Sequence, residues 1–140
     1  MTKDAEAAPV QTLLVVDSEV LVRMAIAAYL RDCGYRVIEA VSVEEALQVL
    51  EREEIVVSLV LAEVALAGSM DGFALAKWVR ERKMAVDVIL AAAPARAAEA
   101  AADLCDKGPM LARPYEPQIV LDRIRRMLAA RKNREAKEPS

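Results

Sequence analysis

The sequence predicts an α/β fold in which five strand–helix units form one parallel sheet with helices on both of its faces. Two kinds of segment alternate along the chain and carry this prediction. Short, mainly apolar runs such as 12–17 and 56–62 suit strands that are buried on both faces of a parallel sheet. The segments between these runs place apolar residues at helical spacing, and 140 residues are the length of one domain.

The strands and helices follow one another at regular intervals. The expected strands are 12–17, 35–40, 56–62, 86–91 and 109–112. The expected helices are 19–33, 43–53, 72–83, 94–106 and 115–131. Ser18 is placed to cap the first helix, and Gly34 is placed to end it. Ser42 and Glu45 have the spacing of a capping box at the start of the second helix.

Polar segments flank the expected domain. Residues 1–10 form a flexible N-terminal tail, residues 11–131 the domain, and residues 132–140 a charged C-terminal tail. The most apolar stretch, 55–68, is too short to span a membrane and contains Glu63. The N-terminus lacks the apolar region of a secretion signal, so we expect a cytoplasmic protein without membrane contact.

The composition excludes several classes of function. A net charge of −3 and a pI near 5.1 give no basic surface for nucleic acid, and the chain has few aromatic residues for stacking on bases. There is no histidine, and the separation of Cys33 and Cys105 fits neither a CxxC redox motif nor a zinc site. A nucleotide-binding enzyme would need a glycine-rich loop after the first strand, and Asp17-Ser18-Glu19 contains no glycine.

Charged residues stand at the ends of three expected strands. Asp17 ends the first strand, Glu63 follows the third, and Arg113 follows the fifth, while Ala91 ends the fourth. In doubly wound sheets, ligands bind beyond the carboxyl ends of the strands. The sequence therefore predicts a site in which two acids and one guanidinium converge beside Ala91.

Short motifs in matching order and spacing extend this pattern over residues 11–130. They are Leu13-Leu14-Val15-Val16-Asp17-Ser18-Glu19, Val22-Arg23, Tyr29-Leu30, Gly34-Tyr35, Glu44-Glu45-Ala46-Leu47, Met70-Asp71-Gly72-Phe73 and Arg113-Pro114-Tyr115. With these motifs the chain resembles the CheY-like receiver domains of response regulators. The resemblance implies a flavodoxin-like doubly wound (βα)5 sandwich whose five-stranded parallel sheet has the strand order 2-1-3-4-5. It also implies a single-domain, non-enzymatic response regulator of two-component (phosphorelay) signal transduction.

The resemblance implies a particular phosphorylation chemistry. Receiver domains accept a phosphoryl group on an aspartate after the third strand. A divalent cation, usually Mg²⁺, is held by that aspartate, by an acidic pair after the first strand and by a backbone carbonyl. A hydroxyl after the fourth strand and a lysine after the fifth bind the phosphoryl oxygens. Oxygen ligands on a hard cation and a positive side chain are what a dianionic group needs.

The chain departs from this pattern at most of the functional positions. Asp17 keeps the first acid of the pair. The other positions hold Ser18 for the second acid, Glu63 for the acceptor, Ala67 for the proline of the next loop, Ala91 for the switch hydroxyl, Met110 for the aromatic switch residue and Arg113 for the lysine.

These departures predict an atypical receiver without standard aspartate phosphorylation. The extra methylene of Glu63 displaces its carboxylate from in-line attack, and an error of about 1 Å costs about 100-fold in rate. Ser18 removes an anionic ligand, so Mg²⁺ would bind only weakly, through Asp17 and Glu63, and we expect no other cofactor. The planar guanidinium of Arg113 suits a carboxylate, and we expect an internal ion pair with Glu63.

The residues leave two alternatives open. Glu63 is either an inert acid in a disabled pocket or a mimic of a phosphorylated aspartate, although Ala91 lacks the hydroxyl through which a mimic would act. Asp17 either binds a cation together with Glu63 or is satisfied by backbone N–H groups and Arg113. The alternative function is a phosphorylation-competent or constitutively active single-domain regulator with Glu63 at the acceptor position.

The resemblance also implies the partners. An isolated receiver acts by docking on a sensor histidine kinase, a phosphotransfer protein or another signalling protein. In related receivers, the face formed by the fourth helix, fifth strand and fifth helix serves output or dimerisation. A homodimer through this face is therefore a second expectation.

Overall fold

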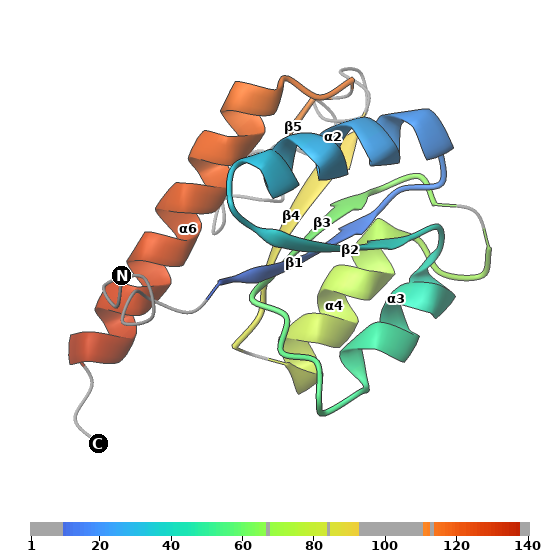
Figure 1. Cartoon of the computed structure of the whole chain (residues 1–140). Helices are drawn as coiled ribbons and strands as arrows, with labels where there is room; N and C mark the ends of the chain where they lie inside the picture. The colour runs from blue at the N-terminus through green and yellow to red at the C-terminus, as the bar shows by residue number, and fades with distance from the viewer. Residues whose placement is uncertain (1–9, 67, 84, 93–110, 113, 138–140) are drawn as a thin grey trace.

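The computed structural model describes residues 10–66, 68–83, 85–92, 111–112 and 114–137. Five parallel strands form one sheet in the order β2-β1-β3-β4-β5 (Figure 1). They are β1 Thr12–Val16, β2 Arg36–Ala40, β3 Leu59–Glu63, β4 Asp87–Ala92 and β5 Leu111–Ala112. The described helices are α2 Val20–Asp32, α3 Val43–Leu50, α4 Gly72–Arg82 and α6 Pro117–Lys137. The predicted fold class and strand order are confirmed, while the helix expected at 94–106 lies outside the described residues.

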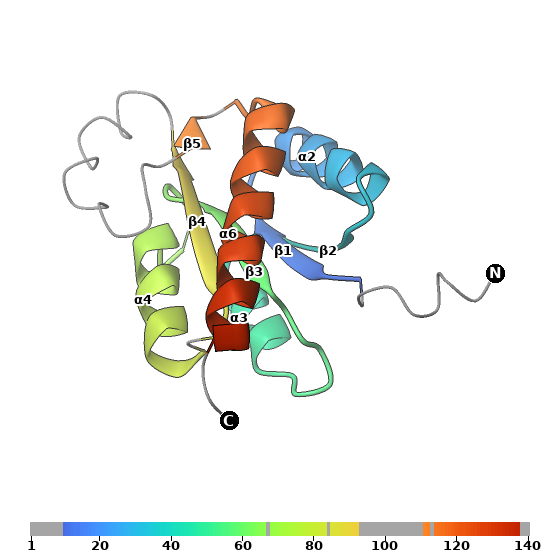
Figure 2. The ribbon, with the colours of Figure 1, turned by 90° about the vertical axis from the view of Figure 1, so that its left-hand side faces the viewer.

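Helices cover both faces of the sheet, as Figure 2 shows. α3 and α4 pack on one face, around a core that includes Leu14 and Leu75. α2 and α6 pack on the other face, around a core that includes Leu13 and Ile124. Strands β1 and β3 are buried at every position, because their alternate side chains enter opposite cores. This double burial is why these two strands are apolar except for Thr12 at the start of β1 and Glu63 at the end of β3.

The strand register brings the ends of β1, β3 and β4 to one edge of the sheet. Val16 of β1 pairs with Ala62 of β3, and Glu63 pairs with Ala91 of β4. The backbone N–H of Asp17 donates to the carbonyl of Ala40 over 3.0 Å, which continues the ladder beyond β1. Asp17, Glu63 and Ala91 therefore stand at the same carboxyl edge, as the sequence predicted.

Two local signals at helix ends are confirmed. The Ser42 hydroxyl accepts a hydrogen bond from the Glu45 N–H over 3.2 Å at the start of α3. The Glu45 carboxylate makes the reciprocal bond of the capping box to the residue before the cap: it accepts from the N–H of Val41 over 2.9 Å. Gly34 follows α2 with a φ of +103°, a conformation that glycine adopts without strain, and its N–H donates to the carbonyl of Arg31.

The predicted cap of the first helix is wrong. The N-cap of α2 is Glu19, and this residue makes no side-chain capping bond. The Ser18 hydroxyl donates instead to the carboxylate of Glu63, 45 positions away in the chain. A long-range partner therefore takes the hydroxyl that the local pattern assigned to the helix.

Two helices end three or more residues away from the predicted position. α3 ends at Leu50 instead of residue 53. α6 continues through residues 132–137, which were expected to belong to the tail, because neither glycine nor proline interrupts it after Pro117. The guanidinium of Arg131 also donates to the carbonyl of Ser58 over 2.7 Å and holds the helix against the start of β3. No helix in the described ranges is long and apolar enough to cross a membrane.

Candidate functional site

The carboxylate of Glu63 is the centre of the candidate site. Glu63 is the last residue of β3, and its side chain lies at the carboxyl edge of the sheet with 4% of the residue exposed. Its Oε1 atom accepts two hydrogen bonds from Ser18, one from the backbone N–H over 2.8 Å and one from the hydroxyl over 2.7 Å. Charge-assisted bonds of this length are among the stronger ones in proteins. Ser18 thus compensates part of the charge of a carboxylate that is removed from water.

Asp17 is fully buried and is held from several sides. Its Oδ1 atom accepts the N–H of Glu19 over 2.9 Å, and its Oδ2 atom lies 3.4 Å from the hydroxyl of Tyr115. The backbone carbonyl of Asp17 accepts a bond from the Arg23 guanidinium over 3.0 Å. A backbone N–H group therefore does contribute to satisfying this acid, as one of the two predicted readings required.

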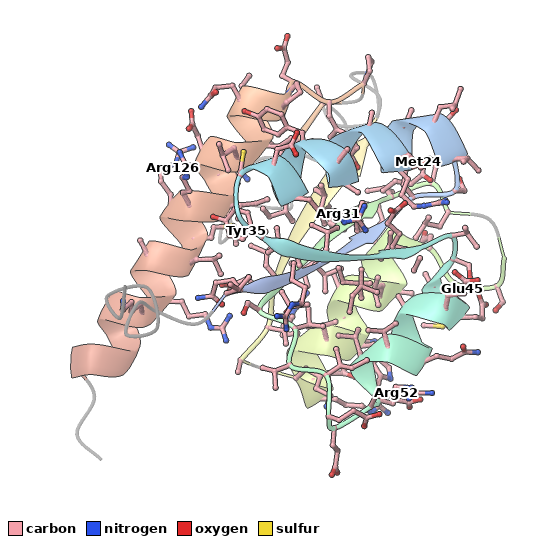
Figure 3. The ribbon with its side chains drawn as sticks, viewed as in Figure 1. Met24, Arg31, Tyr35, Glu45, Arg52 and Arg126 are labelled. Atoms are coloured by element: carbon pink, nitrogen blue, oxygen red, sulfur yellow. The ribbon has the colours of Figure 1, made fainter. Side chains whose placement is uncertain are left out.

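An ion-pair network fixes the segment that carries Asp17. Arg23 of α2 pairs with Glu39 of β2 over 3.0 Å, and the second carboxylate oxygen of Glu39 pairs with Arg31 over 3.1 Å. The Arg31 side chain extends from α2 toward β2 in Figure 3 and also donates to the carbonyl of Val37. Because Arg23 is only 12% exposed and bonds both Glu39 and the Asp17 carbonyl, it links β2 to the edge of the site.

Ala91 lies directly opposite Glu63 in the sheet and is fully buried. Its carbonyl accepts the N–H of Val64 over 2.9 Å, so its backbone continues the ladder beside the site. The side chain is a methyl group, which can neither donate nor accept a hydrogen bond. Ala91 therefore lies where the sequence predicted, and its side chain offers the site no hydrogen-bonding group.

Gly72 allows α4 to begin against the backbone that follows Glu63. A Cβ atom on Gly72 would lie 2.4 Å from the carbonyl oxygen of Glu63 and 2.9 Å from the Cα of Val64. The Gly72 N–H also donates to the Val64 carbonyl over 3.0 Å. Asp71 caps the helix by accepting from the N–H of Ala74 over 3.0 Å. The helix start expected at residue 72 is confirmed, and the close approach explains why this residue is glycine.

Sequence reasoning assigned no role to three residues that shape the site. Tyr115 and Arg23 both occur in the motifs that carry the family resemblance, and Gly72 occurs in another. Tyr115 approaches Asp17 from the far end of the chain, whereas Arg23 and Gly72 meet backbone atoms of nearby residues, Asp17 and Glu63. The motif signal located all three residues without giving their contacts.

Two predicted site residues, Met110 and Arg113, lie outside the described residues, as does Ala67. The expected ion pair between Glu63 and Arg113 therefore stays a prediction. The same holds for the part that Arg113 would play beside Asp17.

The residues present are a poor donor set for Mg²⁺. Nowhere in the described ranges do three or more Asp, Glu, Cys or His side chains gather as a metal site would require. Asp17 and Glu63 each use one carboxylate oxygen to accept N–H groups, and the neutral Ser18 hydroxyl already donates to Glu63. Mg²⁺ dehydrates reluctantly and needs oxygen ligands in near-octahedral geometry, which two engaged carboxylates serve badly.

The chain matches one family over most of its length. Residues 13–125 match the response regulator receiver domain. A protein from Chloroflexus aurantiacus described as a response regulator is 31% identical, with a TM-score of 0.75 over 86% of this chain and 99% of that chain. A search of curated proteins finds no match.

More distant solved structures share the fold. A response regulator receiver protein from Sinorhizobium medicae is 21% identical, with a TM-score of 0.78 over 89% of this chain and 99% of that chain. A CheY-like receiver domain protein from Methanospirillum hungatei is 20% identical, with a TM-score of 0.77 over 90% and 99%. The family match and the 31% identical relative establish that the chain belongs to the response regulator receiver domain family of two-component signalling.

Proposed function

We propose that this chain is an atypical receiver that signals by binding a protein partner, without the standard phosphorylation of an aspartate. The observation that carries the proposal is the double hydrogen bond from Ser18 to Oε1 of Glu63. Receiver domains are in general non-enzymatic signalling modules that interact with kinases or phosphotransfer proteins. The proposal concerns how this member of the family carries out that role.

The first supporting argument is the state of the acceptor carboxylate. An attacking carboxylate must present an oxygen to the phosphodonor, with a cation nearby to neutralise the transferred group. Glu63 is 4% exposed, and one of its oxygens is engaged by two donors from Ser18. Freeing that oxygen requires breaking both bonds, which adds to the barrier for attack.

The second supporting argument is electrostatic. An acid at position 18 would add a charge beside Asp17 and Glu63, and a divalent cation would then be needed to offset three carboxylates. Ser18 instead supplies a hydroxyl donor, so the pocket is satisfied by protein groups. The absence of a hydroxyl at Ala91 removes the group that would report a phosphoryl oxygen to the rest of the fold.

The proposed partner is a sensor histidine kinase, a phosphotransfer protein or another protein of the same pathway. A homodimer through the expected face of residues 94–106, residues 109–112 and α6 stays part of the proposal. Most of that face lies outside the described residues.

The test is phosphorylation by acetyl phosphate with Mg²⁺, followed by mass spectrometry of the intact chain. We expect no added phosphoryl group on the unchanged protein. The variant Ser18→Asp with Glu63→Asp restores the acidic residues of the family pattern and should gain Mg²⁺-dependent phosphorylation. When Ala91→Thr is added, NMR spectra should show that beryllium fluoride shifts signals over a larger part of the domain. Because Ala91 is fully buried, overpacking there costs about 1–3 kcal/mol, so the double variant is measured by itself as well.

The matched control is Glu81→Asp, the same shortening on α4 outside the site. It should change neither phosphorylation nor Mg²⁺ affinity. Mg²⁺-dependent phosphorylation of the unchanged chain that disappears in Glu63→Ala would overturn the proposal. That result would favour the phosphorylation-competent alternative.

A further inference from the structure

The charge of this chain is divided unevenly between its elements. α6 contains seven Lys or Arg residues and two acidic residues, a net charge of +5. Because the whole chain has a net charge of −3, the remaining residues together carry −8. A helix of opposite charge to the rest of its protein creates a strong local field on one side of the molecule.

The outer face of α6 presents part of this positive charge to solvent. Arg125, Arg126 and Lys132 are exposed, and the small residues Ala129 and Ala130 between them are exposed as well. Figure 3 shows Arg126 projecting away from the sheet. Within the part of the chain that the structure describes, neither Arg125 nor Arg126 forms an ion pair.

Like charges on this helix also repel each other. The pKa of Arg123 is lowered by burial and, second, by the neighbouring charge of Arg126. A negative surface docked against α6 would relieve this repulsion. The two alanines would let such a surface approach the helix backbone closely.

The matching negative surface lies at the end of α3. Three acids, Glu51, Glu53 and Glu54, follow the last helical residue, although a helix C-terminus favours cations. The only base among them, Arg52, pairs with Glu54 over 3.0 Å. Glu51 and Glu53 are exposed and take part in no ion pair with the described residues. A shallow hollow of about 430 Å³ adjoins them, lined by Gln48, Val49, Glu51, Arg52 and Ile55.

These two surfaces lie on opposite sides of the sheet. α6 packs in the core shared with α2, and α3 packs in the core shared with α4 (Figure 1). The basic face of one molecule therefore cannot reach its own acidic segment. It can reach the same segment of another molecule, in a head-to-tail contact that does not close on itself.

We propose that the outer face of α6 docks on residues 51–54 of a second copy of this chain. Complementary charge on two faces of one protein is the argument for this occupant. Exposed ion pairs contribute little each and are screened by salt, so the association is weak and depends on protein concentration. This contact differs from a symmetric dimer, because each molecule contributes a different face.

Sedimentation velocity of the full chain over a range of concentrations tests the proposal. The weight-average sedimentation coefficient should rise with concentration in about 0.01 M salt, and it should lose this dependence in about 1 M salt, where the Debye length falls from about 30 Å to about 3 Å. The variant Arg125→Glu with Arg126→Glu should weaken association roughly tenfold or more, and so should Glu51→Lys with Glu53→Lys.

An equimolar mixture of these two variants is the decisive sample, because each supplies the charge that the other lacks. The mixture should associate more strongly than either variant alone. The matched control Lys77→Glu with Arg80→Glu reverses as many exposed charges on α4 and should associate like the unchanged chain. Circular dichroism establishes that each variant is folded.

Three results would overturn the proposal. The first is no association of the unchanged chain at low salt, and the second is a mixture that associates no better than its components. The third is loss of association in Arg125→Glu with Arg126→Glu while Glu51→Lys with Glu53→Lys associates like the unchanged chain. The last result would indicate a symmetric contact of α6 with itself.

Discussion

Ser18 and Glu63 are joined by two hydrogen bonds that end on the same carboxylate oxygen, one from the backbone N–H over 2.8 Å and one from the hydroxyl over 2.7 Å. The two residues connect the loop after β1 to the end of β3. A family position that elsewhere holds an acid here holds a donor.

Removing the Ser18 hydroxyl should destabilise the domain measurably. A hydrogen bond to a charged group contributes about 1.5–3 kcal/mol, and the exposed position of Ser18 places Ser18→Ala near the lower end, at about 1.5 kcal/mol. Urea denaturation measures the change in the free energy of unfolding. Ser69→Ala is the matched control, because that exposed hydroxyl makes only a 3.3 Å bond to Glu44 and its loss should cost less than about 0.5 kcal/mol. Equal stability of Ser18→Ala and the unchanged chain would contradict the prediction.

Adding a methyl group at Gly72 should disturb the segment after Glu63. The new Cβ would lie 2.4 Å from the Glu63 carbonyl oxygen, and a backbone atom cannot move aside as a flexible side chain can. We expect Gly72→Ala to lower the free energy of unfolding by about 1–3 kcal/mol. Thermal denaturation provides the measurement, with Lys77→Ala on the exposed face of α4 as a control that should stay within about 0.5 kcal/mol. A variant at Gly72 that melts with the unchanged chain would show that the close approach is absent.

The ion pair of Arg23 should matter far more than that of Arg52. Arg23 is 12% exposed and bonds both Glu39 and the Asp17 carbonyl, so Arg23→Ala should cost about 1–3 kcal/mol. The side chains of Arg52 and Glu54 are 64% and 66% exposed, and Arg52→Ala should cost about 0–1 kcal/mol. Urea denaturation of both variants compares the two. Equal effects would refute the ranking.

The carboxyl group of Glu54 should titrate below the usual pH range of glutamate. Its pKa is lowered first by a hydrogen bond from its own backbone N–H and second by the side chain of Arg52. A carboxyl group whose pKa is lower in the folded state stabilises the fold at pH values above its unfolded-state pKa. This contribution is lost as the pH falls through its folded-state pKa. Because the Glu54 side chain is largely exposed, the readout is its NMR titration curve and not the stability of the protein.

The variant Arg52→Gln separates the two causes at Glu54. The pKa should rise when the guanidinium is removed but stay below the usual glutamate value, because the backbone bond remains. A pKa that does not move in this variant would exclude the contribution of Arg52.

Much of the architecture followed from the sequence because the relevant forces are local or periodic. The mainly apolar character of β1 and β3 indicated strands covered on both sides, and both are buried at every position. Ser42 and Gly34 were assigned correctly, because a helix cap and a left-handed turn depend on neighbouring residues. Asp17, Glu63 and Ala91 came to one edge because parallel strands end on the same side.

Periodicity thus predicted the fold and the edge at which the site lies, and the motifs predicted the family, because these features are encoded along the chain. The hydrogen-bond partners of individual side chains depend on the three-dimensional packing. Ser18, like Ser42, directly precedes an expected helix, yet its hydroxyl donates to Glu63, since a charged acceptor that is removed from water outweighs a backbone N–H that solvent can satisfy. The contacts of Arg23 and Gly72 also depend on the folded arrangement: Arg23 reaches Glu39 of β2, and Gly72 meets the Glu63 carbonyl, only once the helices pack on the sheet.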